Sequence, residues 1–233
     1  MDIKYFSKFN NIDAGLTLKP DDADERRRAM VGEHKLVVRA KLVHGTDICI
    51  IDKSALKDGP YIEIDDCDGL VTDLKDVVLT TTHGDCIPVY AYDPIKGVIG
   101  IAHSGWKGTA DCVVSALLYW MQEEYKCKPK DIHAVIGAGI GACCFEVDDD
   151  VVDYFTEGMP WTEEYIYKRY DGKYLIDLKA IISELLEIEG LESDNITIDE
   201  SCTCCKENRD RFWTYRGAKD TKRMLAYISI NRD

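Results

Sequence analysis

Side chains in the first half of the chain that can bind transition metals include those of His44, His83, Cys86 and His103. His44 follows an apolar run in LVHGTD, Cys86 lies between two apolar runs, and His103 precedes the glycine-rich stretch SGWKG. His, Cys and His are good zinc ligands, and three protein ligands with an open fourth position are typical of catalytic zinc. Because their separations match no compact zinc motif, spacing alone favours structural histidines over a metal site.

The elements that must position these residues are mostly strands. Apolar, β-branched runs predict strands at residues 35–43, 47–52, 76–82, 87–92, 98–104, 132–140, 165–170, 173–178, 195–202, 211–216 and 225–230. DPIKG, residues 93–97, predicts a hairpin, and so does the Asp-Gly turn at 171–172. Each of His44, Cys86 and His103 falls at a strand end, where loops carry chemistry.

Two helices are predicted, at residues 109–125 and 178–189, because apolar residues recur there at helical spacing and Gly190 is a natural helix stop. KPDDADERRR, residues 19–28, is expected to be an exposed loop that leads into a short helix. This mixture predicts a mixed α/β (α+β) fold, with layered mixed β-sheets covered by helices. No repeat or linker divides the chain, so we expect one domain over residues 1–233.

Composition limits the partners. The chain has 233 residues and a formal net charge of −14, which disfavours a nucleic-acid partner but permits a small anion in a local basic pocket. Its ten cysteines show no disulfide-framework spacing, and no stretch resembles a signal peptide or a membrane span, so we expect a cytoplasmic protein that does not enter membranes. The sequence does not encode an oligomeric state that we can read, and a homo-oligomer is compatible with it.

Six motifs in order resemble those of the YfiH/laccase-domain proteins, formerly called multicopper polyphenol oxidases. They are LVHG, CDGLVT, GDCIPVYAYDP, AHSGWKGT, IGAGIGACCFEV and SCTCCKENRDRFWTYRG with TKRM. The resemblance implies a YfiH-like fold and a zinc ion held by His44, Cys86 and His103. Departures are Leu42 for glutamine, HGDC for TADC, Ala138 for proline and Gly217 for an arginine.

The family resemblance implies purine nucleoside phosphorylase activity, with inosine or adenosine and phosphate as substrates, and adenosine deamination and methylthioadenosine cleavage as companion activities. Phosphorolysis needs an anion cradle and stabilisation of the leaving base. Candidates for the cradle are Lys107 with the amides of GWKGT, Arg216, Arg223 and, more loosely aligned, Arg26. Each of these cations could equally lie on a solvated surface.

Other polar and aromatic residues near these motifs have less definite roles. His83 is an alternative ligand or, like Asp85, a group that contacts the ligands without binding the metal itself. Asp68 and Asp85 are acid/base candidates that could equally cap turns, and they receive no firm role. Trp106 and Phe145 could stack on a purine, although both are more often core residues.

Three alternatives remain open on the sequence. Copper-dependent polyphenol oxidation needs many imidazoles, and the chain has five histidines, so a full trinuclear centre is not supportable; one His-Cys-His site could still bind copper in vitro. Cys86 could be the nucleophile of a cysteine hydrolase with His103 as base. In a non-enzyme interpretation CTCC, with Cys204 and Cys205, forms a thiol or metal-binding surface.

Overall fold

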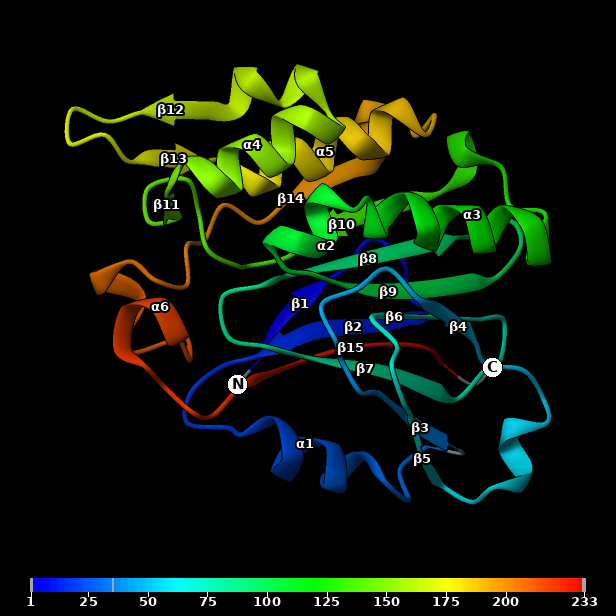
Figure 1. The fold of residues 1–233 in the computed structure, drawn as a ribbon. Helices are drawn as coiled ribbons and strands as arrows, with labels where there is room; N and C mark the ends of the chain where they lie inside the picture. Colours follow the sequence, from blue (N-terminus) through cyan, green and yellow to red (C-terminus); the bar gives the residue numbers. More distant parts are fainter. Residues whose placement is uncertain (1, 35, 232–233) are drawn as a thin grey trace.

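Two six-stranded β-sheets pack face to face in the computed structural model, which describes residues 2–34 and 36–231 (Figure 1). The first sheet has the order β1 (Asp2–Tyr5), β2 (Ile12–Thr17), β15 (Met224–Ile230), β7 (Val77–His83), β3 (Leu36–Ala40) and β5 (Tyr61–Ile64). The second has the order β14 (Ile196–Ile198), β10 (His133–Ile136), β8 (Ile87–Asp93), β9 (Val98–Ser104), β6 (Gly69–Thr72) and β4 (Ile48–Ile50). Both sheets mix parallel and antiparallel pairs, so the predicted layers of mixed sheets are confirmed.

Strand residues alternate between two apolar layers on either side of the first sheet. Leu79 and Ile228 pack between the sheets, whereas their neighbours Val78 and Tyr227 pack toward α1 (Ala23–Met30) on the outer face. Successive strand residues point to opposite faces, so a strand buried on both sides needs apolar residues at every position. This explains why MLAYISI, the sequence of the central strand β15, is apolar almost throughout.

Helices cover the outer face of the second sheet (Figure 1). They are α2 (Trp106–Ala110), α3 (Val113–Tyr125), α4 (Asp149–Gly158) and α5 (Leu178–Ile188), and a small sheet of β11 (Glu146–Val147), β13 (Tyr174–Ile176) and β12 (Ile166–Lys168) lies beside them. Short 3-10 helices occupy Ala55–Lys57, Pro129–Asp131, Pro160–Tyr165, Ser193–Asn195 and Lys206–Asn208. No helix in the described part of the chain is long and apolar enough to cross a bilayer.

The helix predicted at 109–125 is divided in two. Cys112 adopts a left-handed conformation with φ 62°, which ends α2 and lets α3 start in a new direction. Val113, Leu117 and Met121 of the predicted apolar stripe are buried, but Trp120, which was expected in the same stripe, is 37% exposed. The helix predicted at 178–189 forms as α5, and Gly190 ends it with φ 93°.

The predicted strand at 211–216 is wrong. These residues form an irregular segment that leads into α6 (Tyr215–Ala218). The apolar character that suggested a strand comes from Phe212, which is anchored in the core between the sheets, while the Thr214 side chain caps α6 by accepting from the Gly217 amide. β1, β2, β5, β6 and α4 were not predicted, and Lys35, the first residue of the strand predicted at 35–43, lies outside the described residues.

Strand register gathers the candidate ligands at one edge of the two sheets. β8 and β9 form the predicted hairpin, with Ile87 opposite Ser104, so Cys86 lies beside the end of β9 that carries His103. β7 runs into the same edge, where His83 is opposite Met224 of β15. The pairing therefore brings His83, Cys86 and His103 close together at one end of these strands.

The buried face of α3 provides a test of this packing. Replacing Leu117, which is fully buried against the second sheet, with Ala should lower the free energy of unfolding by roughly 2–5 kcal/mol because it leaves a cavity. The matched control is Tyr119→Ala on the exposed side of α3, with an expected change within about 0.5 kcal/mol. Denaturant unfolding of the two variants measures both values, and equal losses would contradict the described orientation of α3.

Candidate metal centre and substrate cavity

His44, Cys86 and His103 bring their donor atoms within 4.8 Å of one another. His44 lies in the loop after β3 with a left-handed backbone, φ 62°, and its ring meets that of His103 edge-on at a centroid distance of 4.9 Å. His103 is only 3% exposed, Cys86 is half-buried and His44 is exposed. The group therefore has a buried side formed by His103 and an open side next to His44.

A buried carboxylate, that of Asp68, holds two of these three residues. Its oxygens accept from the backbone amides of Val43, His44 and Gly45, at 3.1, 3.0 and 2.7 Å, and from the His103 Nδ1 position at 3.0 Å. The loop that carries His44 is thus wrapped around the same side chain that orients the His103 ring. With Nδ1 engaged by Asp68, the Nε2 atom of His103 is the one left for a ligand.

Electrostatics at the group favour ionised side chains. Burial opposes charge on His103, but hydrogen bonds to Asp68 and Cys86 raise the pKa of its imidazole to about 9. Burial likewise raises the pKa of the Cys86 thiol, but His103 and then His44 lower it to about 6. Burial also disfavours the Asp68 carboxylate, and the His103 ring and the amides of Gly45 and Val43 lower its pKa below the ordinary value. Cys86 is therefore a thiolate at neutral pH.

His83 lies beside this group but does not contribute a donor to it. Its ring packs against that of His103 at 5.2 Å, and its two nitrogens are engaged by the Cys86 carbonyl at 3.0 Å and the Thr81 hydroxyl at 2.8 Å. Burial, and next the charge of His103, lower the pKa of His83 well below its usual value, so it is neutral. His83 therefore supports the backbone of Cys86, and neither of its ring nitrogens is available to a metal.

The donor set fits zinc. Two imidazoles and one thiolate are borderline-soft ligands of the kind zinc prefers. The Cys86 thiol is already ionised, as a metal ligand must be, and the His103 ring has the carboxylate partner that metal-bound histidines usually have.

The group lies on the wall of a cavity of about 600 Å³. This volume suits a ligand the size of a nucleoside. Aromatic rings of Trp106, Phe145 and Tyr215 line it, so the two aromatic residues singled out in the sequence are both present, and Tyr215 adds a third ring. The cavity therefore combines metal donors with flat apolar surfaces.

Cationic side chains also line the cavity, and they are only partly those expected. Arg216 and Arg223 are present, together with Arg39 and Lys41, which the sequence did not single out. Lys107 is exposed on α2 and does not line the cavity. With five residues, α2 is too short to form an anion-binding site at its N-terminus.

Arg26 also lies outside the cavity. It is on α1, at the outer face of the first sheet, and pairs with Asp2 at 3.3 Å. The loose alignment that suggested Arg26 is thus not supported by its position. Arg39, at the end of β3 just before the His44 loop, is the arginine that the fold brings to the cavity in that region.

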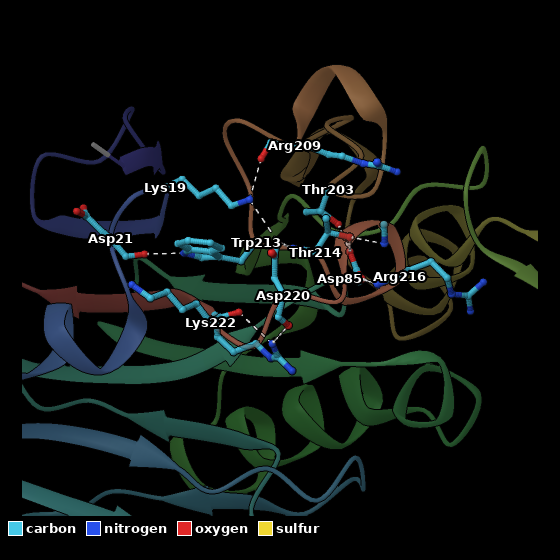
Figure 2. Close-up of polar contacts among 12 residues, drawn as sticks. Lys19, Asp21, Asp85, Thr203, Arg209, Trp213, Thr214, Arg216, Asp220 and Lys222 are labelled. Atoms are coloured by element: carbon cyan, nitrogen blue, oxygen red, sulfur yellow. Dashed lines mark hydrogen bonds and ion pairs between the residues drawn. The ribbon is translucent and has the colours of Figure 1, made fainter.

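Asp85 joins the cavity to the C-terminal part of the chain (Figure 2). Its Oδ1 accepts from the hydroxyls of Thr203 and Thr214, at 2.7 and 2.8 Å, and its Oδ2 accepts from the Arg216 amide at 2.7 Å. The residue has φ 130°, a backbone conformation that favours glycine, and such strain is usually held by surrounding contacts at functional sites. Asp85 is therefore a positioning residue for Arg216.

The opposite side of this C-terminal segment is fixed to residues near the N-terminus (Figure 2). Lys19 donates to the Arg209 carbonyl at 2.8 Å, pairs with Asp220 at 3.2 Å and lies 4.4 Å from the centre of the Trp213 ring. The Trp213 indole donates to the Asp21 carbonyl at 2.8 Å. Together with the Asp85 contacts, these interactions hold the segment that presents Tyr215 and Arg216 from both sides.

The remaining histidines lie elsewhere. His34 pairs with Asp76 at 3.3 Å, and His133 contacts Lys8 at 3.0 Å and the ring of Phe9. Within residues 2–34 and 36–231, the imidazoles that could share a metal are those of His44 and His103, so the donors of a trinuclear copper centre are not assembled.

Comparison with known proteins identifies the family of this chain. The family described as "Multi-copper polyphenol oxidoreductase laccase" matches residues 7–231. A relative from Geobacillus stearothermophilus named "Purine nucleoside phosphorylase YlmD" is 35% identical over 191 residues, 80% of this chain and 69% of the relative. A relative of the same name from Bacillus subtilis is 33% identical over 165 residues, but the match spans 58% of that protein.

Among solved structures, the crystal structure of a hypothetical protein YfiH from Bacillus licheniformis superposes with a TM-score of 0.88 at 27% identity. The superposition covers 99% of this chain and 96% of that one, so the YfiH-like fold extends over the whole length described. With the family match to residues 7–231, this places the chain in the laccase-domain (YfiH) family of multi-copper polyphenol oxidoreductase laccase proteins.

Proposed function

We propose that this chain is a zinc-dependent purine nucleoside phosphorylase, which converts inosine or adenosine and phosphate to the free base and ribose 1-phosphate. The observation that carries the proposal is the His44, Cys86 and His103 donor group on the wall of a nucleoside-sized cavity that also holds aromatic rings and arginines. The names of the Geobacillus and Bacillus relatives point to the same activity.

The aromatic lining provides a site for the purine. Trp106 is 36% exposed and Tyr215 56% exposed, so both rings have faces available to a ligand, while Phe145 is buried beneath the Arg216 guanidinium at 5.5 Å. Stacking of a base on an aromatic side chain contributes about 1–3 kcal/mol and is tolerant of the base's identity. This arrangement suits more than one purine.

The arginines provide a site for phosphate. Arg39 and Lys41 are paired with Glu63, at 3.0 and 3.1 Å, which offsets part of their charge. Arg216 and Arg223 instead donate to backbone carbonyl oxygens, which carry no net charge. Because guanidinium groups bind phosphate through paired hydrogen bonds, we assign the anion to Arg216 and Arg223.

The metal donors and Asp68 complete the machinery. Zinc held by His44, Cys86 and His103 would supply a Lewis acid that stabilises negative charge developing on the substrate. Asp68 keeps the His103 ring and the His44 loop in place, and the exposed position of His44 leaves the donor group accessible from the cavity. Leaving-group stabilisation and the anion site thus come from separate residues.

Adenosine deamination and methylthioadenosine phosphorolysis belong to the same proposal as companion activities. Deamination needs water to attack C6 of the purine, whereas phosphorolysis cleaves the glycosidic bond. The products distinguish them, because adenosine gives inosine in the first case and adenine in the second.

A cysteine hydrolase is the second candidate, and one observation favours it. The Cys86 thiol has a pKa of about 6 because of its contact with His103, and a thiolate beside an imidazolium is the pair such enzymes use. The same ionisation prepares Cys86 to bind zinc. The two interpretations therefore differ in whether activity depends on a metal.

The donor assignment leads to a prediction about metal content. His44→Ala, Cys86→Ala and His103→Ala should each lose one equivalent of zinc relative to the parent, because a three-ligand site loses geometry and charge with any ligand. His83→Ala should keep more zinc than these three, since both His83 nitrogens are engaged by protein groups. Elemental analysis of the purified proteins tests this, and an equal loss in His83→Ala would make His83 a ligand.

The position of Asp68 leads to a second prediction. Asp68→Asn should weaken zinc binding by roughly 10- to 100-fold, because the amide is neutral and can accept through only one oxygen. Competition with a chromophoric chelator measures the affinity. Asp66→Asn, at an exposed neighbouring carboxylate, is the matched control and should leave the zinc affinity unchanged. Equal zinc affinities of the two variants would show that Asp68 does not support the site.

The assignment of phosphate to the arginines leads to a third prediction. With inosine or adenosine, the protein should release base only when phosphate is present, and Arg216→Ala should raise the phosphate KM by roughly 10- to 100-fold, the effect of a lost charge-assisted hydrogen bond. Lys107→Ala should leave KM near the parent value because Lys107 does not line the cavity. Steady-state assays of ribose 1-phosphate formation provide both values.

Chelation separates the two candidate functions in the same assay. Activity that is lost on chelation and restored by zinc supports the phosphorylase. Activity that survives chelation but is abolished by thiol alkylation supports Cys86 as a nucleophile. No release of base from any purine nucleoside by zinc-loaded protein would contradict the proposed function.

A further inference from the structure

A second group of metal-binding side chains lies outside the cavity. Cys143, Cys144, Cys202 and Cys205 place their sulfur atoms within 4.8 Å of one another. The Cys205 sulfur is 3.4 Å from that of Cys143 and 3.7 Å from that of Cys144. Nothing in the proposed phosphorolysis uses these thiols.

The fold explains why these four residues meet. β10 and β14 are parallel neighbours, with Ile136 opposite Ile198, so the chain leaves both strands at the same end of the second sheet. Beyond the strands, Gly139 and Cys202 form an isolated parallel bridge, and the Thr203 amide donates to the Gly139 carbonyl at 3.0 Å. The two cysteine-bearing segments are thus held side by side by main-chain contacts.

The distances suit one metal ion better than a disulfide. Tetrahedral zinc with Zn–S bonds of about 2.3 Å separates its sulfurs by about 3.8 Å, close to the two distances from Cys205. A disulfide needs a sulfur separation of about 2.05 Å, and all ten cysteines are free. Cys202 and Cys205 also have the C-x2-C spacing that is common in zinc sites.

The backbone around Cys202 favours a thiolate at that residue and leaves room for the group. The Gly141 amide donates to the Cys202 sulfur at 3.2 Å, a contact that stabilises negative charge on sulfur. A Cβ at Gly141 would lie 3.3 Å from the Cys202 Cβ and 3.4 Å from the Cys143 sulfur, so the glycine allows the backbone to approach the group closely. Cys202 is buried and Cys143 is exposed, which gives the group an anchored side and a side open to solvent.

We propose that Cys143, Cys144, Cys202 and Cys205 bind a second zinc ion in a structural, four-thiolate site. A site with four protein ligands has no open position, and soft thiolates select zinc over hard cations. The ion connects a segment of the cavity wall to a segment that supports the wall. Phe145, which lines the cavity, follows Cys144, and Thr203, between Cys202 and Cys205, donates to the lining residue Asp85. The role of the ion is to hold these two segments together.

Metal content of the purified full-length chain tests the proposal without any assay of catalysis, so its outcome is independent of the proposed function. The parent should contain two zinc ions per chain. Cys143→Ser, at the exposed edge, and Cys205→Ser should each lose one, and Cys86→Ala should lose the other. Cys204→Ala is the matched control, because Cys204 neighbours the group but lies outside it, and it should keep both.

A spectroscopic measurement covers the case in which a serine variant folds poorly. In Cys86→Ala loaded with cobalt, any thiolate-to-cobalt charge transfer must come from the four-cysteine group, and it should disappear when Cys143→Ser is added. Parental zinc content in Cys205→Ser, no charge transfer in cobalt-loaded Cys86→Ala, or a disulfide joining Cys143 and Cys205 would each overturn the proposal.

Discussion

The carboxylate of Asp68 is the interaction on which the candidate metal centre depends. It is fully buried, which is costly for a charge unless hydrogen bonds compensate, and four donors surround it. Three of them are consecutive backbone amides, so the loop that carries His44 can close only around this side chain, and the fourth is the His103 ring. A single buried charge therefore fixes the direction of one imidazole and the path of the loop that carries the other.

Asp85, which precedes Cys86 in the sequence, is a second carboxylate that accepts several hydrogen bonds and positions its surroundings. Asp85 accepts three hydrogen bonds from residues far along the chain. These bonds hold the segment with Tyr215 and Arg216 next to Cys86. The two aspartates differ in what they organise. Asp68 positions groups that could bind a metal, whereas Asp85 positions groups that could bind a substrate. Cys86 belongs to the same candidate metal centre as Asp68 and directly follows Asp85 in the sequence.

The sequence predicted those parts of the structure that depend on local pattern. The β8–β9 hairpin followed from two apolar runs joined by DPIKG, and the buried face of α3 followed from helical spacing. Cys112 could not be predicted to break a helix, because a cysteine side chain carries no local signal for the left-handed backbone that it adopts here. Phe212 and Trp213 suggested a strand, although they anchor an irregular segment to the core. The roles of Asp68 and Asp85 were hidden for a related reason: a carboxylate that caps a turn and one that orients a ligand look identical until its long-range partners are known.

The position of strand β15 in the first sheet limits the order in which this protein can fold. His44, Asp68, Cys86 and His103 all lie in the first 103 residues, but β15, residues Met224–Ile230, is inserted between β2 and β7 in the first sheet. β7 ends at His83, opposite the first residue of β15. During synthesis on the ribosome the residues of the candidate metal centre therefore emerge long before the strand that completes the sheet beneath them. Such long-range pairing makes folding slow, and the centre reaches its final form only when one of the last-made strands enters the middle of the sheet.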